Sequence, residues 1–480
     1  MDRMEPNAQP AVAPPRSPYL EGPYAPIADE ITATDLPVIG ELPRDLAGMY
    51  VRNGSNPRHA PKGRYHWFDG DGMVHGLHVE GGRATYRNRY VQTAALREES
   101  AAGHALWTGI MEPPDLRRRG GPFKDTANTD LVFHAGRFMA LWWLGGACHQ
   151  LSLPALETLG VVDFGSPLKK GLSAHPKVDP VTGEMMFFDY ALTPPYLTYG
   201  VISADGRLVH QVPIELPGAR LQHDIAITAR HTILMDLPLL WDPALLAKGK
   251  TRVRFDRDKP SRFGLIPRHG GADEVRWFEA SACYMYHTIN AWEEGDEVVL
   301  LGCRIANPLP DAVDPSRVVP RLDALALEPY LHEWRFDLVT GAVRERQLDD
   351  VMTEFPRMNN DLLGRASRYS YNPRVAAEPT LLYDGVIKYD TVAGSSVAYG
   401  YGPGRFGGEV AFAPRVGSTA EDDGYLVTFV HDRASGRGEA VVLDARDVAA
   451  GPVARVVLPQ QVPIGYHSWW VPAAQMAAAP

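Results

Sequence analysis

The chain has 480 residues, of which 45% are hydrophobic and 22% are charged, and its formal net charge is −10. This composition is typical of globular proteins, and the acidic balance argues against a broad nucleic-acid-binding surface, which requires clustered Lys and Arg. The three cysteines, Cys148, Cys283 and Cys303, show no CxxC spacing, so neither a disulfide framework nor a zinc knuckle is indicated.

The beginning of the chain predicts a flexible arm. Residues 1–26 are rich in Pro and Ala and carry no hydrophobic periodicity, which is typical of a loosely held segment. They also lack the charged-then-apolar order of a secretory signal, and no apolar run in the chain approaches the roughly 20 residues that span a bilayer. We therefore expect a cytoplasmic protein with an arm at 1–26 and a single folded domain at 27–480.

Strands dominate the rest of the chain. From about Ile39 onward, short β-branched and aromatic runs such as 82–91 and 297–301 are separated by Gly, Asp, Pro and Asn, as in hairpins. Helical periodicity is scarce outside 97–106 and 242–247. Many short strands must manage their edges, and a β-propeller does this by radial repetition. The sequence thus predicts an all-β propeller, although no clean repeat fixes the number of blades.

One apolar stretch leaves two interpretations open. Residues 237–246 are rich in Leu and Pro, and four basic residues follow before Asp256. This pattern is compatible with peripheral contact between 237–254 and a membrane surface, or with a buried cap helix.

Four histidines stand in similar contexts beside predicted strand ends: His175, His223, His287 and His467. They are far apart in the sequence, so each would come from a different blade, and a propeller allows such residues to meet on its axis. Neutral imidazole binds Fe, Cu, Ni and Zn alike, and the usual CxxC and HExxH contexts of zinc are missing. Taken singly, a histidine among the sixteen of this chain is more often a packed or surface residue than a ligand.

A series of motifs nevertheless resembles the carotenoid cleavage oxygenase family, in the family's order and over about residues 35–473. They are Tyr50-Val-Arg-Asn-Gly-Ser-Asn-Pro57, Trp67-Phe-Asp-Gly-Asp-Gly-Met-Val-His75, Ala127-Asn-Thr129, Ala174-His-Pro-Lys177, His223-Asp, His287-Thr-Ile-Asn-Ala-Trp292, Glu354-Phe-Pro-Arg357, Gly408-Glu409 and Gly465-Tyr-His467. The resemblance implies a seven-bladed β-propeller with a helical, partly apolar cap, and Fe(II) on its axis bound by the same four histidines.

The resemblance also implies residues that support and surround the metal. Glu354 and Glu409 match family glutamates that hydrogen bond to metal-bound imidazoles. A third such glutamate is replaced here by Trp143, whose indole cannot accept a conventional hydrogen bond at nitrogen. We therefore expect water or a backbone carbonyl to take over, or the iron to be held less tightly. Thr129 matches a catalytic-site residue close to the iron, and Phe68, Trp142, Trp143 and Trp292 could line a substrate tunnel.

The activity implied is cleavage of a C=C double bond by O2, giving two carbonyl products. Lignostilbene dioxygenases carry a Lys that engages a phenol, and this chain has Trp142 in its place, so an apolar carotenoid or apocarotenoid is favoured over a stilbene or phenylpropene. The missing glutamate keeps a second hypothesis open, a propeller that binds a ligand without chemistry. The scissile bond and the oligomeric state do not follow from the sequence.

Overall fold

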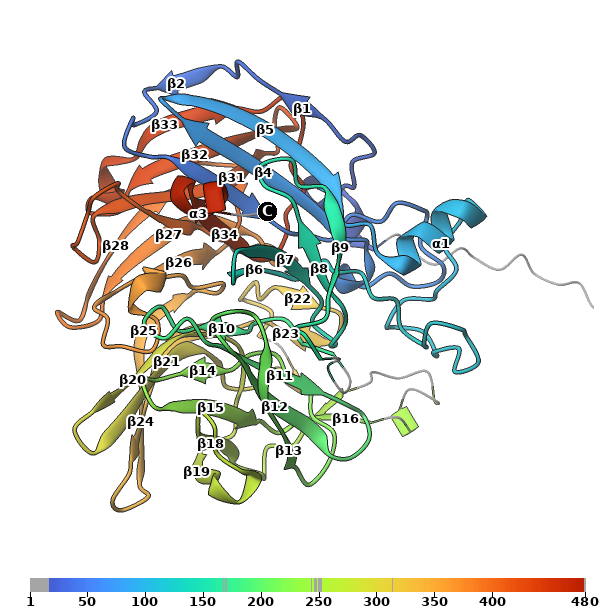
Figure 1. Ribbon diagram of the computed structural model, residues 1–480, viewed down its shortest axis with the longest axis vertical. Coiled ribbons are helices and arrows are strands. Elements are labelled where there is room, and N and C mark those ends of the chain that lie inside the picture. Colours follow the sequence, from blue (N-terminus) through green and yellow to red (C-terminus); the bar gives the residue numbers. More distant parts are fainter. Residues whose placement is uncertain are drawn as a thin grey trace, which may run out of the picture.

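The computed structural model describes residues 17–166, 168, 171–242, 244–245, 248, 253–312 and 314–478. Over these residues the protein is nearly all β, as expected, and its sheets follow one another around a centre in chain order (Figure 1). The alternation of buried and exposed positions along outer strands such as β5 (Arg83–Tyr90) is the period-2 pattern that the sequence shows.

Five of the sheets contain four or five strands each. In spatial order they are β1 (Thr32–Ala33), β5, β4 (Met73–Glu80), β3 (Gly48–Arg52) and β34 (Ser468–Pro472); β6 (Asp130–His134), β7 (Arg137–Leu141), β8 (Cys148–Leu151) and β9 (Thr158–Val162); β10 (Lys177–Val178), β11 (Met185–Tyr190), β12 (Tyr196–Ile202) and β13 (Leu208–Glu215); β14 (Ala226–Ile227), β15 (His231–Asp236), β18 (Ser261–Pro267) and β19 (Arg276–Ala280); and β20 (Tyr284–Glu294), β21 (Glu297–Ile305), β24 (Pro329–Asp337) and β25 (Val343–Met352).

The remaining large sheet contains nine strands. Its path is β2 (Val38–Gly40), β33 (Pro452–Val457), β32 (Arg437–Asp444), β31 (Gly424–Asp432), β29 (Arg405–Gly407), β27 (Tyr383–Asp390) and β26 (Tyr369–Val375), with β28 (Ser395–Gly400) on β27 and β30 (Ala411–Pro414) on β31. A single residue pair, Tyr383 with Gly407, joins β27 to β29. Divided at this weak link, the described strands form seven larger sheets around the centre, besides two sheets of two strands each, in agreement with the expected propeller.

The two ends of the folded chain meet in the first sheet. The antiparallel register of β3 and β34 pairs Gly48 with Pro472 and Arg52 with Ser468. A strand from the end of the chain thus completes a sheet begun near its start, so the ring of sheets is closed by backbone hydrogen bonds rather than by side-chain packing alone.

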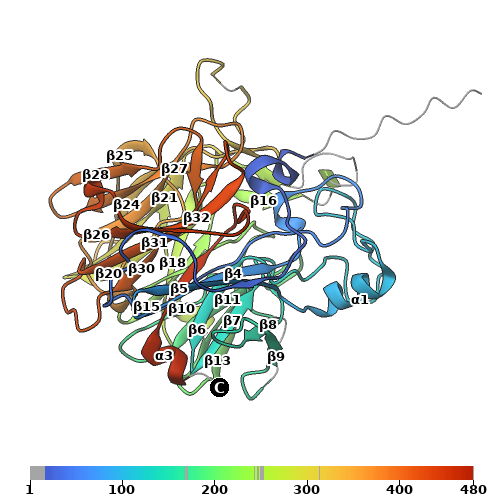
Figure 2. The ribbon, with the colours of Figure 1, turned by 90° about the horizontal axis from the view of Figure 1, so that it is seen from above.

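Helices contribute little. The α-helices with named bounds are α1 (Ala94–Ala102) and α3 (Ala473–Ala478), and short 3-10 turns occur at η1 (Pro18–Leu20), η2 (Gly22–Tyr24), η3 (Trp67–Asp69), η4 (Ala272–Glu274), η5 (Asn360–Leu362) and η6 (Val448–Ala450). The Thr93 side chain caps the first turn of α1, and Gly103 ends the helix in the left-handed conformation. Figures 1 and 2 both show α1 at the periphery of the molecule.

The predicted helices and arm need correction. The first helix begins and ends earlier than the expected 97–106, because Thr93 and Gly103 are its capping residues. The expected arm is also too long: Tyr19 and Tyr24 are buried and their rings contact Trp67. Burial of two large aromatic side chains is favourable enough in free energy to hold this segment in one conformation. Residues 1–16 lie outside the described residues.

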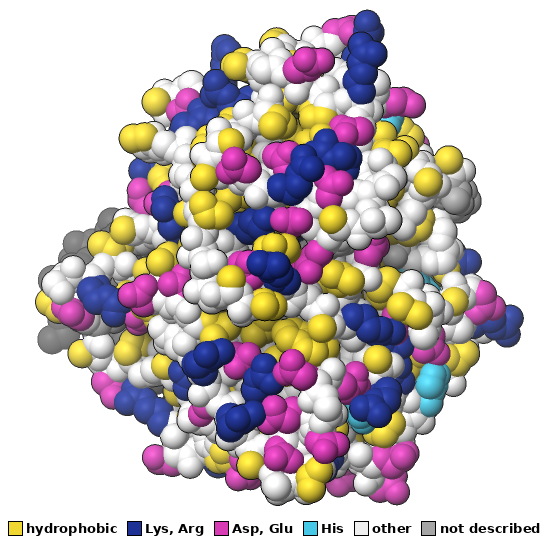
Figure 3. Space-filling model, turned by 90° about the vertical axis from the view of Figure 1, so that its left-hand side faces the viewer, with side chains coloured by type: hydrophobic (Ala, Val, Ile, Leu, Met, Phe, Trp, Pro, Cys, Tyr) yellow, Lys and Arg dark blue, Asp and Glu magenta, His cyan; other side chains and the backbone are white. Residues whose placement is uncertain are grey.

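Charges of both signs are mixed on the face shown in Figure 3, where Lys and Arg side chains lie among Asp and Glu. Ion pairs at the surface include Arg368 with Asp390. None of the described helices is long and apolar enough to cross a membrane.

Candidate metal centre and adjoining pocket

The four predicted histidines converge. His175 lies just before β10, His223 between β13 and β14, His287 within β20 and His467 just before β34. One ring nitrogen from each lies within 4.8 Å of the other three, and all four residues are buried. Elements far apart in the sequence therefore place four imidazoles around one centre, as the propeller hypothesis requires.

The local backbone explains how these rings point inward. His175 has a φ of +69°, a left-handed conformation that is unfavourable for a residue with a Cβ and is often found at functional sites. In β20, the pairing with β21 shifts register between Met285 and Thr288, so the strand is irregular at His287. Such a bulge redirects a side chain relative to the strand around it.

The spacing of the nitrogens fits a metal ion. His223 Nε2 and His287 Nε2 are 3.2 Å apart, close to the separation of neighbouring ligands that each lie about 2 Å from one ion. His175 Nε2 is buried without a hydrogen-bond partner among the described residues, which is costly unless something else uses its lone pair. The site can therefore hold one cation at the centre of the four rings.

Three of the imidazoles are held in the form that binds metal. Burial lowers the pKa of His175, His223 and His467, and neighbouring histidines lower each of these pKa values further. A neutral imidazole offers a lone pair, whereas a protonated one does not. At neutral pH these three rings are thus ready to act as ligands.

Both predicted glutamates lie directly behind the histidines. Glu354 Oε2 accepts a hydrogen bond from Nδ1 of His287, and Glu409 Oε1 lies 2.9 Å from Nδ1 of His467. Each carboxylate leaves the Nε2 of its histidine free to face the centre. Burial raises the pKa of Glu409 to about 7, and Arg357 opposes this shift.

A network of charges that we did not predict joins the strands beneath the histidines. Lys177 Nζ lies 2.6 Å from Asp224 Oδ1, and Asp224 Oδ2 accepts hydrogen bonds from the backbone N–H and the hydroxyl of Thr288, both at 2.8 Å. These three residues follow His175, His223 and His287 closely in the sequence. Their positions next to the histidine motifs are the sequence feature from which this network could have been predicted.

A second unpredicted group surrounds Glu409. Arg357 Nη2 lies 2.8 Å from Glu409 Oε2 and 2.7 Å from the carbonyl oxygen of Ser468. The Ser468 hydroxyl also donates to Glu409 Oε2, at 2.9 Å. Arg357 stands in the Glu-Phe-Pro-Arg motif, so one motif supplies both a carboxylate for His287 and a cation for the carboxylate of His467.

His175 also lies next to a carboxylate side chain. Asp130, at the start of β6, places Oδ2 3.2 Å from Nδ1 of His175. We expected water or a backbone carbonyl to take over from the missing glutamate, or the iron to be held less tightly, and this stays a prediction. His223 hydrogen bonds to no carboxylate in the part of the chain that the structure describes.

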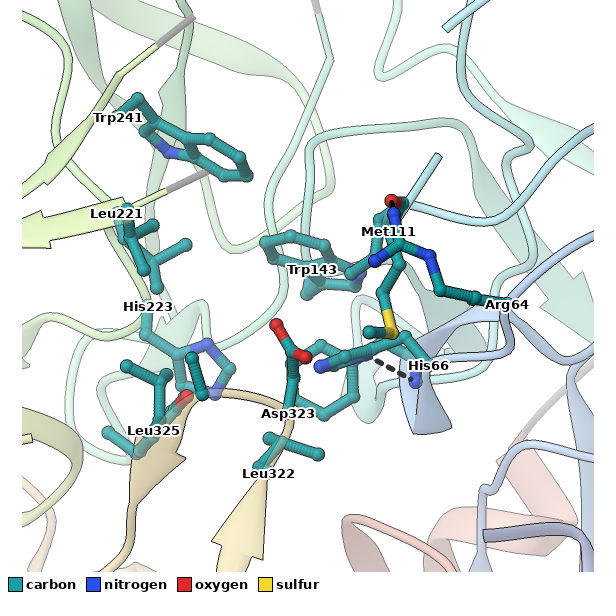
Figure 4. A pocket seen from close by; sticks show the side chains of 15 residues that line it. Arg64, His66, Met111, Trp143, Leu221, His223, Trp241, Leu322, Asp323 and Leu325 are labelled. Atoms are coloured by element: carbon teal, nitrogen blue, oxygen red, sulfur yellow. Dashed lines mark hydrogen bonds between the residues drawn. The ribbon is translucent and has the colours of Figure 1, made fainter. Parts of the chain in front are cut away.

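A pocket of about 470 Å³ reaches one of the four histidines, His223. Its lining is mostly apolar and includes Phe68, Trp143, Leu221, Trp241 and Leu325 (Figure 4). Phe68, His223, Tyr286 and Leu322 also line a smaller cavity that contains His287 and His467. The two cavities adjoin through these shared residues, so the pocket leads from the surface to the centre.

The two ends of the pocket differ in polarity. His223 and Tyr286 at the inner end are buried, whereas Arg64 and Asp323 are exposed to solvent. Figure 4 shows the Asp323 side chain directed into the pocket. The cover is made of loops and of two hairpins, β16 (Leu239–Trp241) with β17 (Val253–Phe255) and β22 (Arg321–Leu322) with β23 (Leu325–Ala326). The cap that the resemblance implies is thus built, in the described residues, mainly from loops and hairpins.

The other predicted site residues divide into two groups. Thr129 lines the small cavity next to the histidines, and its hydroxyl accepts the backbone N–H of Trp143 at 3.1 Å. Phe68 and Trp143 line the pocket. The tunnel roles of Trp142 and Trp292 stay predictions. Trp142 lines a groove with Leu144 and a small cavity with Phe68 rather than the pocket itself, and Trp292 packs on a separate apolar cluster. Both tryptophans follow the end of β7, and of the two only Trp143 lines the pocket.

The segment 237–254 is only partly described. Leu237, Leu239 and Leu240 are buried, and Trp241 and Val253 line the pocket. These side chains cover the site rather than forming an exposed apolar surface. Most of 243–252, including part of the helix expected at 242–247, lies outside the described residues, and contact with a membrane stays a prediction.

Comparisons with known proteins cover nearly the whole chain. The family model described as "Retinal pigment epithelial membrane protein" matches residues 24–472. The carotenoid 9,10(9',10')-cleavage dioxygenase 1 of Phaseolus vulgaris is 40% identical, over 95% of this chain and 90% of its own length.

Solved structures match equally broadly. The lignostilbene dioxygenase of Pseudomonas brassicacearum superimposes with a TM-score of 0.86 at 30% identity, over 96% of this chain and all of that chain. A Glu150Asp mutant of the Synechocystis apocarotenoid oxygenase gives a TM-score of 0.83 at 29% identity, over 94% of this chain and 98% of that chain.

Proposed function

The chain belongs to the carotenoid cleavage oxygenase family, a family of dioxygenases, and from this premise we propose that it uses Fe(II) and O2 to split one C=C double bond of an apocarotenoid. The observation that carries this proposal is the meeting of His175, His223, His287 and His467 at the inner end of an apolar pocket.

The donor set supports iron. Four neutral imidazoles accept several divalent metals, but zinc has no redox chemistry, and a dioxygenase requires a metal that can react with O2. Iron bound here would supply that reaction, leaving open positions because the histidines provide only four ligands. The ligand roles of the four histidines and the identity of the metal are part of this proposal.

The protein's own residues would supply positioning and exclusion of water. Glu354 and Glu409 hold two imidazoles in one tautomer, so their nitrogens face the centre before any ion binds. Phe68, Thr129 and Tyr286 surround the cavity beside the histidines and would hold one alkene bond of the substrate there. Fixing a reactant in place in this way removes much of the entropic cost of a reaction.

The lining of the pocket supports an extended apolar substrate. Leu221, Trp241 and Leu325 offer hydrocarbon and aromatic surface, and burial of apolar surface contributes roughly 25 cal/mol per Å² without any polar partner. An apocarotenoid would place its polyene along these side chains and its polar end near the exposed end of the pocket, where Arg64 and Asp323 lie.

A phenolic stilbene is the alternative substrate. The similarity to the lignostilbene dioxygenase favours it, and so does the Tyr286 ring, which lies 4.8 Å from the His223 ring and could contact a small aromatic substrate. Against it, Trp142 replaces the Lys that the resemblance associates with a phenol, and Trp142 does not line the pocket.

Metal analysis tests the first half of the proposal. The purified protein, reconstituted anaerobically with Fe(II), should retain about one iron per chain and consume O2 with substrate. His287→Ala should lose both properties. The matched control is His210→Ala, because His210 bonds to the carbonyl oxygen of Gly270 far from the cluster. Equal iron content in wild type and His287→Ala would overturn the proposed site.

A substrate comparison tests the second half. The iron-loaded protein is incubated separately with an apocarotenal and with a phenolic stilbene, and the products are identified by mass spectrometry. We expect two carbonyl products from the apocarotenal and none, or far less, from the stilbene. Aromatic aldehydes from the stilbene alone would replace our substrate by the alternative.

A further inference from the structure

Asp130 makes two contacts with one histidine. Its Oδ2 accepts the backbone N–H of His175 at 3.1 Å and lies 3.2 Å from Nδ1 of the same residue. Its other oxygen accepts the backbone N–H of Leu131 at 2.7 Å. Asp130 and His175 are both buried. Asp130 thus holds the backbone and the ring of His175 together, where the chain adopts its left-handed conformation.

The contact decides which nitrogen of His175 faces the centre. An ionised carboxylate can only accept a hydrogen bond, so Nδ1 carries the hydrogen and donates it to Asp130, and Nε2 keeps its lone pair. Nε2 is the buried atom for which the described residues provide no hydrogen-bond partner. The same arrangement is present at His287 with Glu354 and at His467 with Glu409.

The fourth histidine lacks this support. His223 faces the pocket together with Trp143, and the Phe68 ring lies 6.5 Å from the His223 ring and 5.4 Å from Trp143. An indole at this position supplies apolar surface to the pocket and no acceptor for an imidazole N–H. Three carboxylates therefore contact the histidines of the site, and their partners are His175, His287 and His467.

We propose that Asp130 is a positioning residue that orients His175 toward the metal. It provides the third carboxylate behind the histidines in a chain where Trp143, at the position of the family glutamate, lines the pocket. This inference rests on the proposed metal site and concerns how that site is built. Asn at position 130 cannot reproduce the contacts, because both carboxylate oxygens accept N–H groups and an amide has only one oxygen. One N–H group would then face the NH2 group of the amide.

The test compares Asp130→Asn with wild type by metal affinity and by spectroscopy. Apparent dissociation constants for Co(II) are measured by competition with a chelator, and the visible absorption of the bound Co(II) reports on ligand geometry. We expect affinity to fall by about ten- to a hundredfold and the absorption bands to shift. Asp130→Glu, which keeps the carboxylate, should recover part of the affinity.

A matched control separates positioning from general stability. Asp236 is also a buried aspartate, but it pairs with Arg220 and Arg262 away from the four histidines. Asp236→Asn should lower the melting temperature and leave the Co(II) affinity and spectrum unchanged. If Asp130→Asn behaves in the same way, Asp130 has a structural role only and the inference is overturned.

The two proposals fail differently. If wild type binds Co(II) as tightly as His287→Ala does, the metal site itself is wrong and both proposals fall. If wild type binds Co(II) in a histidine-dependent way and Asp130→Asn matches it in affinity and spectrum, only the role of Asp130 is lost. If Asp130→Asn does not fold, the same measurements on Asp130→Glu decide, with an affinity and spectrum equal to wild type counting against the inference.

Discussion

The two sides of the histidine cluster are built from opposite materials. Behind the rings lie buried charges in fixed pairs, such as Lys177 with Asp224 and Arg357 with Glu409. In front of them lies an apolar pocket lined by residues such as Leu221 and Trp241. Charged hydrogen bonds demand one geometry, whereas apolar contacts tolerate many. The back of the site should therefore fix the metal, and the front should select the substrate.

The largest expected effect comes from breaking a buried pair behind the rings. Arg357→Met leaves Glu409 buried without its cation, which typically lowers the free energy of unfolding by about 3–5 kcal/mol. Chemical denaturation measures this change. Arg446→Met removes an exposed pair with Asp444 and should cause no measurable loss. Equal free energies of unfolding for the two variants would show that the buried pair of Arg357 and Glu409 contributes no more to stability than an exposed pair does.

The next effect concerns the metal rather than stability. Glu354→Gln and Glu409→Gln should each weaken retention of iron about ten- to a hundredfold, because Gln can present its NH2 group to the imidazole and favour the wrong tautomer. Iron content after dialysis against a chelator measures this. Glu293→Gln is the control, because Glu293 contacts Thr228 and His231. This variant should retain as much iron as wild type.

A smaller effect is expected in front of the rings. Trp241→Ala removes aromatic surface from the hairpin that covers the pocket, and we expect KM for an apolar substrate to rise roughly tenfold, as loss of one large apolar contact implies. Iron content should not change. Trp292→Ala, at a tryptophan outside the pocket, should leave KM near the wild-type value. A loss of iron in Trp241→Ala would contradict the assignment of metal binding to the back of the site alone.

The smallest effect is expected at the exposed end. Asp323 is exposed to solvent but faces the pocket, whose walls partly desolvate its carboxyl group and raise its pKa. An apolar substrate that covers it must therefore remove water from a charge. Asp323→Asn should lower KM for a hydrocarbon by about two- to threefold and leave kcat unchanged. Steady-state kinetics with a carotene and with its ring-hydroxylated derivative measure this. A change in kcat would place Asp323 closer to the chemistry than its exposure indicates.

The sequence predicted the back of the site better than the front. The four histidines, Glu354 and Glu409 stand in motifs, because a metal site needs particular side chains at particular backbone positions. Lys177, Asp224 and Arg357 lie in or beside the same motifs and could have been included. The pairing of each carboxylate with its histidine depends on neighbouring strands, so Asp130 could not be assigned from the chain alone.

The pocket left weaker signals. Leu221, Trp241 and Leu325 resemble any core residue, and only the folded hairpins bring them over the histidines. Trp142 and Trp143 could not be told apart until the strand that precedes them showed which one faces inward. The all-β class followed from residue alternation and turns, whereas the burial of Tyr19 and Tyr24 depended on a partner, Trp67, that is distant in sequence.

The pairing of β3 with β34 has a consequence for biosynthesis. His467 immediately precedes β34, its backbone N–H donates to the carbonyl oxygen of Thr129 and its own carbonyl oxygen accepts from Asn53. The last imidazole therefore arrives together with the strand that seals the ring. A nascent chain that ends before β34 lacks His467, so the proposed metal site can be completed only after translation has reached this strand.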